Sequence, residues 1–217
     1  MTSPTQTGGL DLDDAGATAL EWAKTHSRQL GIGVIVVAAL AGVLWVVRSQ
    51  QEGNELTASR QLVAAQRSVG AGNLPLAAAD LRKLVDRYGS TRAGREAQVL
   101  LAQVELQQGK TADALKVLDE MGSGGAQAGS MHALRAAALE QTGKPAEAAA
   151  EYLKASAATS LSGEAESLRA DAARAYLAAG KKDEALRIWK DMAANPASVL
   201  YSEALLRVGE LSAQVQK

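Results

Sequence analysis

Four glycine-centred turns recur along the chain, and their spacing restricts the possible folds more than any other feature of the sequence. The turn glycines are Gly72, Gly109, Gly143 and Gly180, so they are separated by 37, 34 and 37 residues. An alanine follows each glycine five residues later, at Ala77, Ala114, Ala148 and Ala185. A period of this length is typical of stacked helix-turn-helix units, each of which buries its apolar faces against its neighbours.

Small residues also precede each turn at a constant distance. Seven residues before the glycines stand Ala65, Ala102, Ala136 and Ala173. An alanine lets two helix backbones approach closely, so we expect all eight alanines to be buried at helix crossings. Four residues after each second alanine comes a large apolar residue, at Leu81, Leu118, Tyr152 and Trp189. We expect the glycines themselves to adopt the left-handed conformation that ends a helix.

The composition favours helix almost everywhere outside one short window. Alanine, leucine, glutamate, lysine, arginine and glutamine dominate, and the chain contains no phenylalanine. Summed propensity therefore predicts an all-α fold. A last apolar-periodic stretch, residues 199–213, has no second helix after it and is interpreted as the capping helix that such a solenoid requires.

An uncharged stretch near the N-terminus predicts a membrane anchor. Nineteen consecutive residues, Gln29 to Val47, carry no charge and lie between Arg28 and Arg48. At ~1.5 Å per residue this segment is about 28 Å long as a helix, close to the ~30 Å hydrocarbon core of a bilayer. A buried core helix and a cleaved signal peptide are the alternatives. The small-residue cleavage candidate lies inside the apolar run, so we interpret the segment as an uncleaved signal anchor.

The predicted organisation has three parts. Residues 1–20 mix proline, glycine, threonine and acids without an apolar face, which predicts a disordered tail. Residues 21–48 form the transmembrane anchor and its flank, and residues 49–217 form a helical solenoid of about four repeats plus a cap. One face of the anchor is the candidate for docking another membrane helix, because its residues are mostly small: Gly31, Ile35, Ala38 and Gly42.

Charge and residue inventory argue against several classes of function. The net charge is −1, and residues 49–217 hold 20 basic and 20 acidic residues, which predicts no nucleic-acid partner. The chain has no cysteine, and its two histidines, His26 and His132, are far apart in sequence. We therefore predict no catalytic residues, no metal, no cofactor and no small-molecule substrate. The positive charges flanking the anchor do not decide its orientation.

The glycine turns and their flanking alanines resemble the tetratricopeptide repeat. That repeat has small residues at its eighth and twentieth positions, a large apolar residue at the twenty-fourth, and often a late proline, here Pro196. The resemblance implies that the first helix of each repeat lines a concave partner groove. The candidate groove residues are Gln66, Val99, Gln103, Gln107, Glu140, Gln141 and Arg174. Glutamine can donate to and accept from a peptide backbone, although these positions could equally be solvated surface.

The order of tail, anchor and alanine-rich repeats resembles the YfgM-like ancillary subunits of the bacterial Sec translocon, from about Glu21 to Ala213. The resemblance implies a single-pass protein of the bacterial inner membrane with periplasmic repeats. The implied partners are the lipid bilayer, the Sec translocon and a membrane-anchored periplasmic chaperone. The resulting hypothesis is a membrane-anchored protein-protein interaction scaffold and not an enzyme. The alternative is a structural accessory subunit of another membrane complex, for example an energy-transducing or photosynthetic one.

Overall fold

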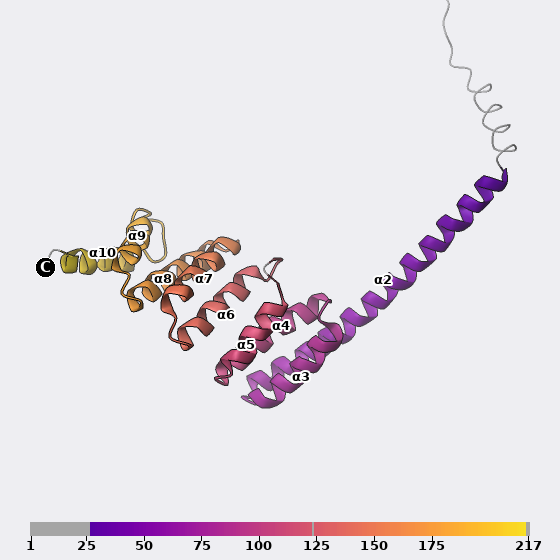
Figure 1. Cartoon of the computed structure of the whole chain (residues 1–217), viewed down its shortest axis with the longest axis horizontal. Coiled ribbons are helices and arrows are strands. Elements are labelled where there is room, and N and C mark those ends of the chain that lie inside the picture. The colour runs from indigo at the N-terminus through magenta and orange to yellow at the C-terminus, as the bar shows by residue number, and fades with distance from the viewer. Residues whose placement is uncertain (1–26, 123, 216–217) are drawn as a thin grey trace, which may run out of the picture. The chain divides into compact units, whose positions relative to one another are not determined.

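A computed structural model describes residues 27–122 and 124–215, and every regular element within those ranges is an α-helix (Figure 1). The helices are α2 (Ser27–Gly70), α3 (Leu74–Tyr88), α4 (Arg92–Gln107), α5 (Thr111–Glu120), α6 (Ala128–Gln141), α7 (Pro145–Ala158), α8 (Ser162–Ala178), α9 (Lys182–Ala193) and α10 (Tyr201–Val215). The chain divides into two units, residues 1–52 and 53–217, and α2 belongs to both. The all-α prediction is confirmed for the part that the structure describes.

In the first unit, the uncharged segment forms part of α2, a single helix of 44 residues. Within the described residues, none of the helices meets the combined requirements of length and apolar character for crossing a membrane. The predicted tail, residues 1–20, lies outside the described residues. The side chains of Gly31, Ile35 and Ala38 on the predicted docking face are also outside what is described, whereas Gly42 is exposed with open space around it.

In the second unit, the helices pair in the order expected of a helix-turn-helix solenoid. The last turns of α2 pack with α3, and α4 pairs with α5, α6 with α7, and α8 with α9. The second helix of each pair also contacts the first helix of the next pair, and α10 packs on α9. The predicted repeat architecture is confirmed, and the segment expected to cap it is helical from Tyr201 onward.

The four turn glycines end the first helix of each pair in the same way. Their φ angles lie between 73° and 75°, which confirms the predicted left-handed conformation. At the second turn, the Gly109 N–H donates to the Leu106 carbonyl and the Lys110 N–H donates to the Glu105 carbonyl. The other three turns repeat this pair of hydrogen bonds. The pattern is a Schellman motif, which satisfies carbonyl groups that a helix end leaves without partners.

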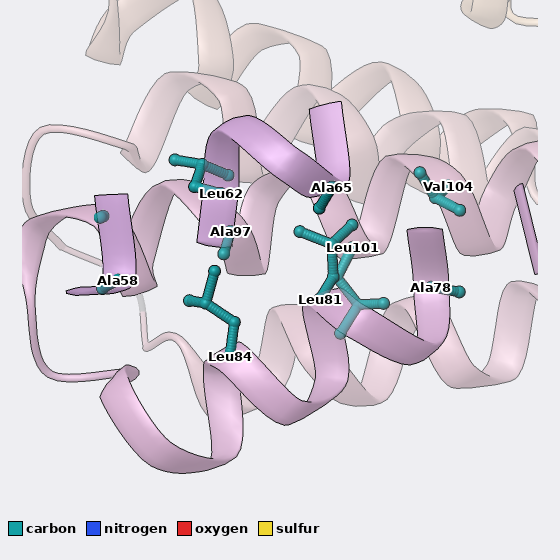
Figure 2. Close-up of a cluster of buried hydrophobic side chains, with 10 residues drawn as sticks. Ala58, Leu62, Ala65, Ala78, Leu81, Leu84, Ala97, Leu101 and Val104 are labelled. Carbon is teal, nitrogen blue, oxygen red and sulfur yellow. The ribbon is translucent and has the colours of Figure 1, made fainter. Parts of the chain in front are cut away.

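The core lies between the helices of each repeat and the next. Figure 2 shows its N-terminal part, where Ala58, Leu62 and Ala65 of α2 meet Leu81 of α3 and Leu101 of α4. All eight alanines predicted at helix crossings are 0% exposed. The large residues expected four positions later are buried too, from 0% exposure at Leu81, Leu118 and Trp189 to 9% at Tyr152. Both packing predictions are therefore confirmed.

The connections between repeats differ from one another. The α3–α4 turn is tight, because a Cβ added to Gly94 would overlap the carbonyl of Tyr88. The α5–α6 connection is longer and contains two further glycines in the left-handed region, Gly122 and Gly125. The sequence predicts a flexible hinge over 122–129, but the last two of these residues already belong to α6.

Candidate protein-interaction face

The first helices of the four repeats, α2 from Gly53 onward, α4, α6 and α8, carry the residues predicted to bind a partner. We call the surface formed by these helices the A-helix face. Its N-terminal part contains a groove between α2 and α4 with a volume of about 320 Å³. The groove is lined by Glu55, Ser59, Leu62, Val63 and Gln66 of α2 and by Arg92, Ala93 and Glu96 of α4. Its α2 wall therefore combines two apolar side chains, Leu62 and Val63, with the polar side chains of Glu55, Ser59 and Gln66.

The carboxylate of Glu55 joins the two walls of this groove. Its Oε2 accepts a hydrogen bond from the Arg92 N–H at 2.7 Å, and its Oε1 accepts one from the Ala93 N–H at 2.9 Å. These donors belong to the first turn of α4, where backbone N–H groups lack partners within the helix and the helix dipole favours negative charge. The first turn of α4 is thus attached to α2 of the preceding repeat.

The predicted residues on α2 and α4 are available to a partner. Gln66 lies in the groove, and Gln66, Gln103 and Gln107 are all exposed, whereas Val99 is half-buried. Within the described part of the chain, these three glutamine side chains make no hydrogen bond, so their donors and acceptors face solvent. An amide can pair with both groups of a peptide backbone. Their role as binding residues stays a prediction.

Gln141, another predicted binding residue, instead links neighbouring repeats. Its Oε1 accepts a hydrogen bond from the Thr111 hydroxyl at 2.8 Å, and its Nε2 donates to the Leu106 carbonyl at 3.5 Å. Gln108 makes an equivalent link one repeat earlier, donating from Nε2 to the Leu74 carbonyl at 3.1 Å. Amide side chains at the ends of the first helices therefore tie the second and third repeats to the repeats that precede them.

The remaining two candidates, Glu140 and Arg174, also have partners inside the protein. Glu140 accepts a hydrogen bond from the Tyr152 hydroxyl at 2.9 Å, and burial together with this carboxylate raises the pKa of Tyr152. Arg174 pairs with Glu203 and Asp171, each at 2.7 Å, and the hydrogen bond that it donates to Glu203 raises the pKa of Arg174.

The Arg174 guanidinium also lies 5.8 Å from the centroid of the Trp189 ring. At this distance a cation and an aromatic face attract each other. Trp189 belongs to α9 and Glu203 to α10. Arg174 of α8 therefore connects the last repeat to the capping helix, in addition to any contact that it makes with a partner.

His132 belongs to a second charged cluster, between α6 and α7. Its Nδ1 lies 2.7 Å from Oε2 of Glu151, and Lys154 donates to the other carboxylate oxygen at 2.7 Å. Burial raises the pKa of Glu151, but hydrogen bonds from Lys154 and His132 outweigh it and leave that pKa lowered. The cluster joins two helices and contains neither a nucleophile nor a metal-binding set.

Glu105 is a buried charge that the sequence analysis did not identify. Its side chain is 0% exposed and lies 2.6 Å from the Arg82 guanidinium, which also contacts Asp113 at 3.3 Å. Removing one partner of a buried ion pair is strongly unfavourable, so the pair fixes α3 against α4. No signal in the sequence distinguishes Glu105 from exposed glutamates. The equivalent positions, four residues before the other turn glycines, are occupied by Ser68, Leu139 and Tyr176, which share no polar or apolar character.

Of the eight groove residues only Gln66 was predicted, and the seven others include Ser59, Val63 and Glu96. A search for side chains on the same helix face as Gln66 and Val99 could have found Ser59, Val63 and Glu96, since they lie three or seven residues away. In the described residues there is no group of three or more histidines, aspartates and glutamates that could hold a metal ion. That the chain has no catalytic residue and no cofactor stays a prediction.

Comparison with known protein families identifies a tetratricopeptide repeat-like domain in the chain. The family profile described as a tetratricopeptide repeat-like domain matches residues 46–172, which is more than half of the chain. The matched range begins before the first turn glycine and ends within α8. No curated protein matches the chain.

Proposed function

The chain belongs to the tetratricopeptide repeat-like family, and from this premise we propose that it is a membrane-anchored scaffold for protein-protein interaction. Tetratricopeptide repeats bind proteins rather than catalyse reactions. The observation that carries the proposal is the A-helix face, where Gln66 in the α2–α4 groove and Gln103 and Gln107 on α4 have exposed side-chain amides. We propose no enzymatic activity.

The proposed anchor is the uncharged segment from Gln29 to Val47. Its length and flanking arginines support this assignment, as does the resemblance to YfgM-like proteins. The same helix, α2, continues into the first repeat, so the proposed anchor and the binding face belong to one continuous element. On this proposal the protein lies in the bacterial inner membrane, with its repeats in the periplasm.

The proposed partners are subunits of the Sec translocon and a membrane-anchored periplasmic chaperone. The α2–α4 groove combines the apolar side chains of Leu62 and Val63 with the amide of Gln66, a combination that suits extended or partly folded polypeptide. The bilayer is the third proposed partner. A structural role in a different membrane complex remains the alternative outcome of the experiment below.

Site-specific photo-crosslinking in native membranes tests the partner. A crosslinking amino acid at Gln66 or Gln103 is expected to capture translocon or chaperone subunits. The same amino acid at Lys116, an exposed residue of α5, is the matched control and should not capture them. Crosslinks from the groove positions to subunits of an energy-transducing or photosynthetic complex would instead establish the alternative.

The membrane assignment has its own test. Membranes are extracted with carbonate, and intact cells and spheroplasts are treated with protease. We expect the full chain to stay in the membrane pellet and the repeats to be cut only in spheroplasts. A version without residues 29–47 should be released. Release of the full chain by carbonate would refute the anchor without affecting the proposed groove.

A further inference from the structure

The N-terminal edge of the solenoid is uncovered in the part of the chain that the structure describes. In later repeats, α4, α6 and α8 each pack against the second helix of the preceding repeat, namely α3, α5 and α7. No described repeat precedes α2. On this side α2 and α3 form a hollow of about 750 Å³, lined by Gln61, Ala64, Asp80, Lys83, Asp86 and Arg87. We call these six residues the open edge.

The charges of the open edge lie on one helix and balance one another. Asp80, Lys83 and Arg87 follow at helical spacing along the outer side of α3, and Asp86 lies beside them. Within the described residues, the one ion pair among these four is Asp80 with Lys83, at 3.8 Å with the lysine 79% exposed. Such exposed pairs are weak. These two acidic and two basic side chains of α3 therefore have a net charge of zero and can form ion pairs with another molecule.

The open edge contains one small residue, Ala64, and an exposed apolar residue, Leu76, precedes it on α3. Leu76, one turn before Asp80, is 47% exposed although it is a large apolar residue. Ala64 of α2 lines the hollow with a small side chain, and Gln61 of the same helix lines it with an exposed polar one. Between the longer side chains of Gln61, Lys83 and Arg87, the small Ala64 therefore leaves room for a helix to approach α2 and α3.

We propose that the open edge pairs with the open edge of a second copy of this chain, with the two α3 helices antiparallel about a two-fold axis. In such a contact each interaction occurs twice, so the surface must be complementary to itself. Reversing α3 brings Asp80 of one copy opposite a basic residue, Lys83 or Arg87, of the other. A surface of one charge sign would repel its own copy, whereas this one does not.

The two-fold arrangement accounts for the difference between the two ends of the solenoid. At the C-terminal end, α10 covers α9 and buries Ala204 and Leu211 against it. At the N-terminal end, the second copy takes the position that the second helix of a preceding repeat has beside α4, α6 and α8. The contact closes after two copies, because a two-fold contact uses the same surface on both. This inference does not depend on the partner of the A-helix face. Because reversing α3 also reverses the part of α2 that packs on it, the pairing and the proposed anchors fit one membrane only if α2 bends between the anchor and the first repeat.

Reciprocal charge reversal tests the inference in the full chain, purified in mild detergent. The basic-edge variant carries Asp80→Lys and Asp86→Lys, and the acidic-edge variant carries Lys83→Glu and Arg87→Glu. Sedimentation equilibrium should show a wild-type dimer that weakens as salt rises. Each variant alone should have a dimer dissociation constant raised at least about tenfold, because like charges then face each other.

An equimolar mixture of the two variants is the decisive measurement. The acidic and basic edges complement each other, so the mixture should form heterodimers with near wild-type affinity. Misfolded variants could not do this, and circular dichroism should show unchanged helix content in each. The matched control, Lys182→Glu with Lys190→Glu on exposed positions of α9, should dimerise like the wild type.

A second measurement uses the absence of cysteine from the chain. Ala64→Cys, in the hollow, should be linked into dimers by a short bis-maleimide, whereas Ala112→Cys, exposed on α5, should not. A monomeric wild type, variants that dimerise like the wild type, or a mixture that stays monomeric would each overturn the inference.

Discussion

At the scale of single residues, the four turn glycines hold a backbone conformation that other residues adopt only at a cost. Each has a φ near 74° and places its N–H, and that of the next residue, on carbonyls of the preceding helix. A side chain at such a φ brings Cβ too close to the backbone, a cost of about 1–2 kcal/mol. The glycines are therefore required by the turn, and their regular spacing in the sequence reflects that requirement.

Two glycine substitutions should have opposite effects on stability. Gly109→Ala is expected to lower the free energy of unfolding by about 1 kcal/mol, because φ is 73° there. Gly209→Ala should raise it by about 0.5–1 kcal/mol, because Gly209 lies inside α10 with open space around it. The urea midpoint measures both. A shift of both midpoints in the same direction would contradict the assignment of the turn.

The Glu151 carboxylate makes stability depend on pH in the acid range. Its pKa is lowered from the ordinary 4.5, so folding favours its charged form. The resulting stabilisation is fully present above pH 4.5 and is lost as pH falls below it through the lowered pKa. Glu151→Gln should therefore flatten the loss of stability between pH 4.5 and more acid values. It should also lower stability at pH 7 by about 1 kcal/mol.

Glu147→Gln is the matched control for this measurement. Glu147 lies one turn earlier on α7 and is 63% exposed, with a single ion pair to Lys144 at 3.8 Å. Its substitution should leave almost unchanged both the loss of stability below pH 4.5 and the stability at pH 7. If both substitutions reduce the loss of stability below pH 4.5 equally, the His132–Glu151–Lys154 cluster is not the source of the pH dependence.

At the scale of helices, the ends and the buried faces could be predicted from the sequence, but the partners of polar side chains could not. Ala65 and Ala102 recur at a fixed distance from a glycine, so periodicity alone indicates that they are buried. Gln141 and Gln107 lie on the same kind of helix face, yet only Gln141 finds a hydroxyl, that of Thr111, on the adjacent repeat. That difference depends on a residue 30 positions away.

The same limit applies to Arg174 and Glu105. Arg174 lies on the A-helix face as its repeat position predicts, but Glu203 on the capping helix engages it. Glu105 occurs where the other repeats have Ser68, Leu139 and Tyr176, and its buried carboxylate pairs with Arg82 of α3. A period predicts which face of a helix a residue occupies. It does not predict which side chain of the neighbouring helix will be within reach.

The attachment of α4 to Glu55 is the prediction that belongs to this scale. Glu55→Ala removes acceptors for the N–H groups of Arg92 and Ala93, and losing a helix N-terminal cap typically costs about 1 kcal/mol. Hydrogen exchange should therefore become faster in the first turn of α4. Glu52→Ala, one turn earlier on α2 and exposed, is the control. Unchanged exchange at Arg92 and Ala93 would contradict the capping role.

At the scale of the molecule, the described core is a series of clusters joined through shared helices. The first cluster contains residues of α2, α3 and α4, and the next contains α4, α5 and α6. The third spans α6 to α8, and the fourth spans α8 to α10. Consecutive clusters share α4, α6 and α8. Stability should therefore be a sum of local and nearest-neighbour contributions, as in other repeat proteins.

A charge placed inside the last cluster tests this arrangement. Ala204 of α10 is 0% exposed, whereas Leu206 on the same helix is 61% exposed. Ala204→Glu buries an unpaired carboxylate against α9 and should increase hydrogen exchange throughout α8, α9 and α10. Protection in α2 to α5 should stay unchanged, because α8 and Ile188 of α9 connect the last cluster to the α6–α8 cluster and not directly to α2–α5. Leu206→Glu should alter neither region. If Ala204→Glu instead lowers protection equally from α2 to α10, the solenoid unfolds as one cooperative unit, and the nearest-neighbour description is wrong.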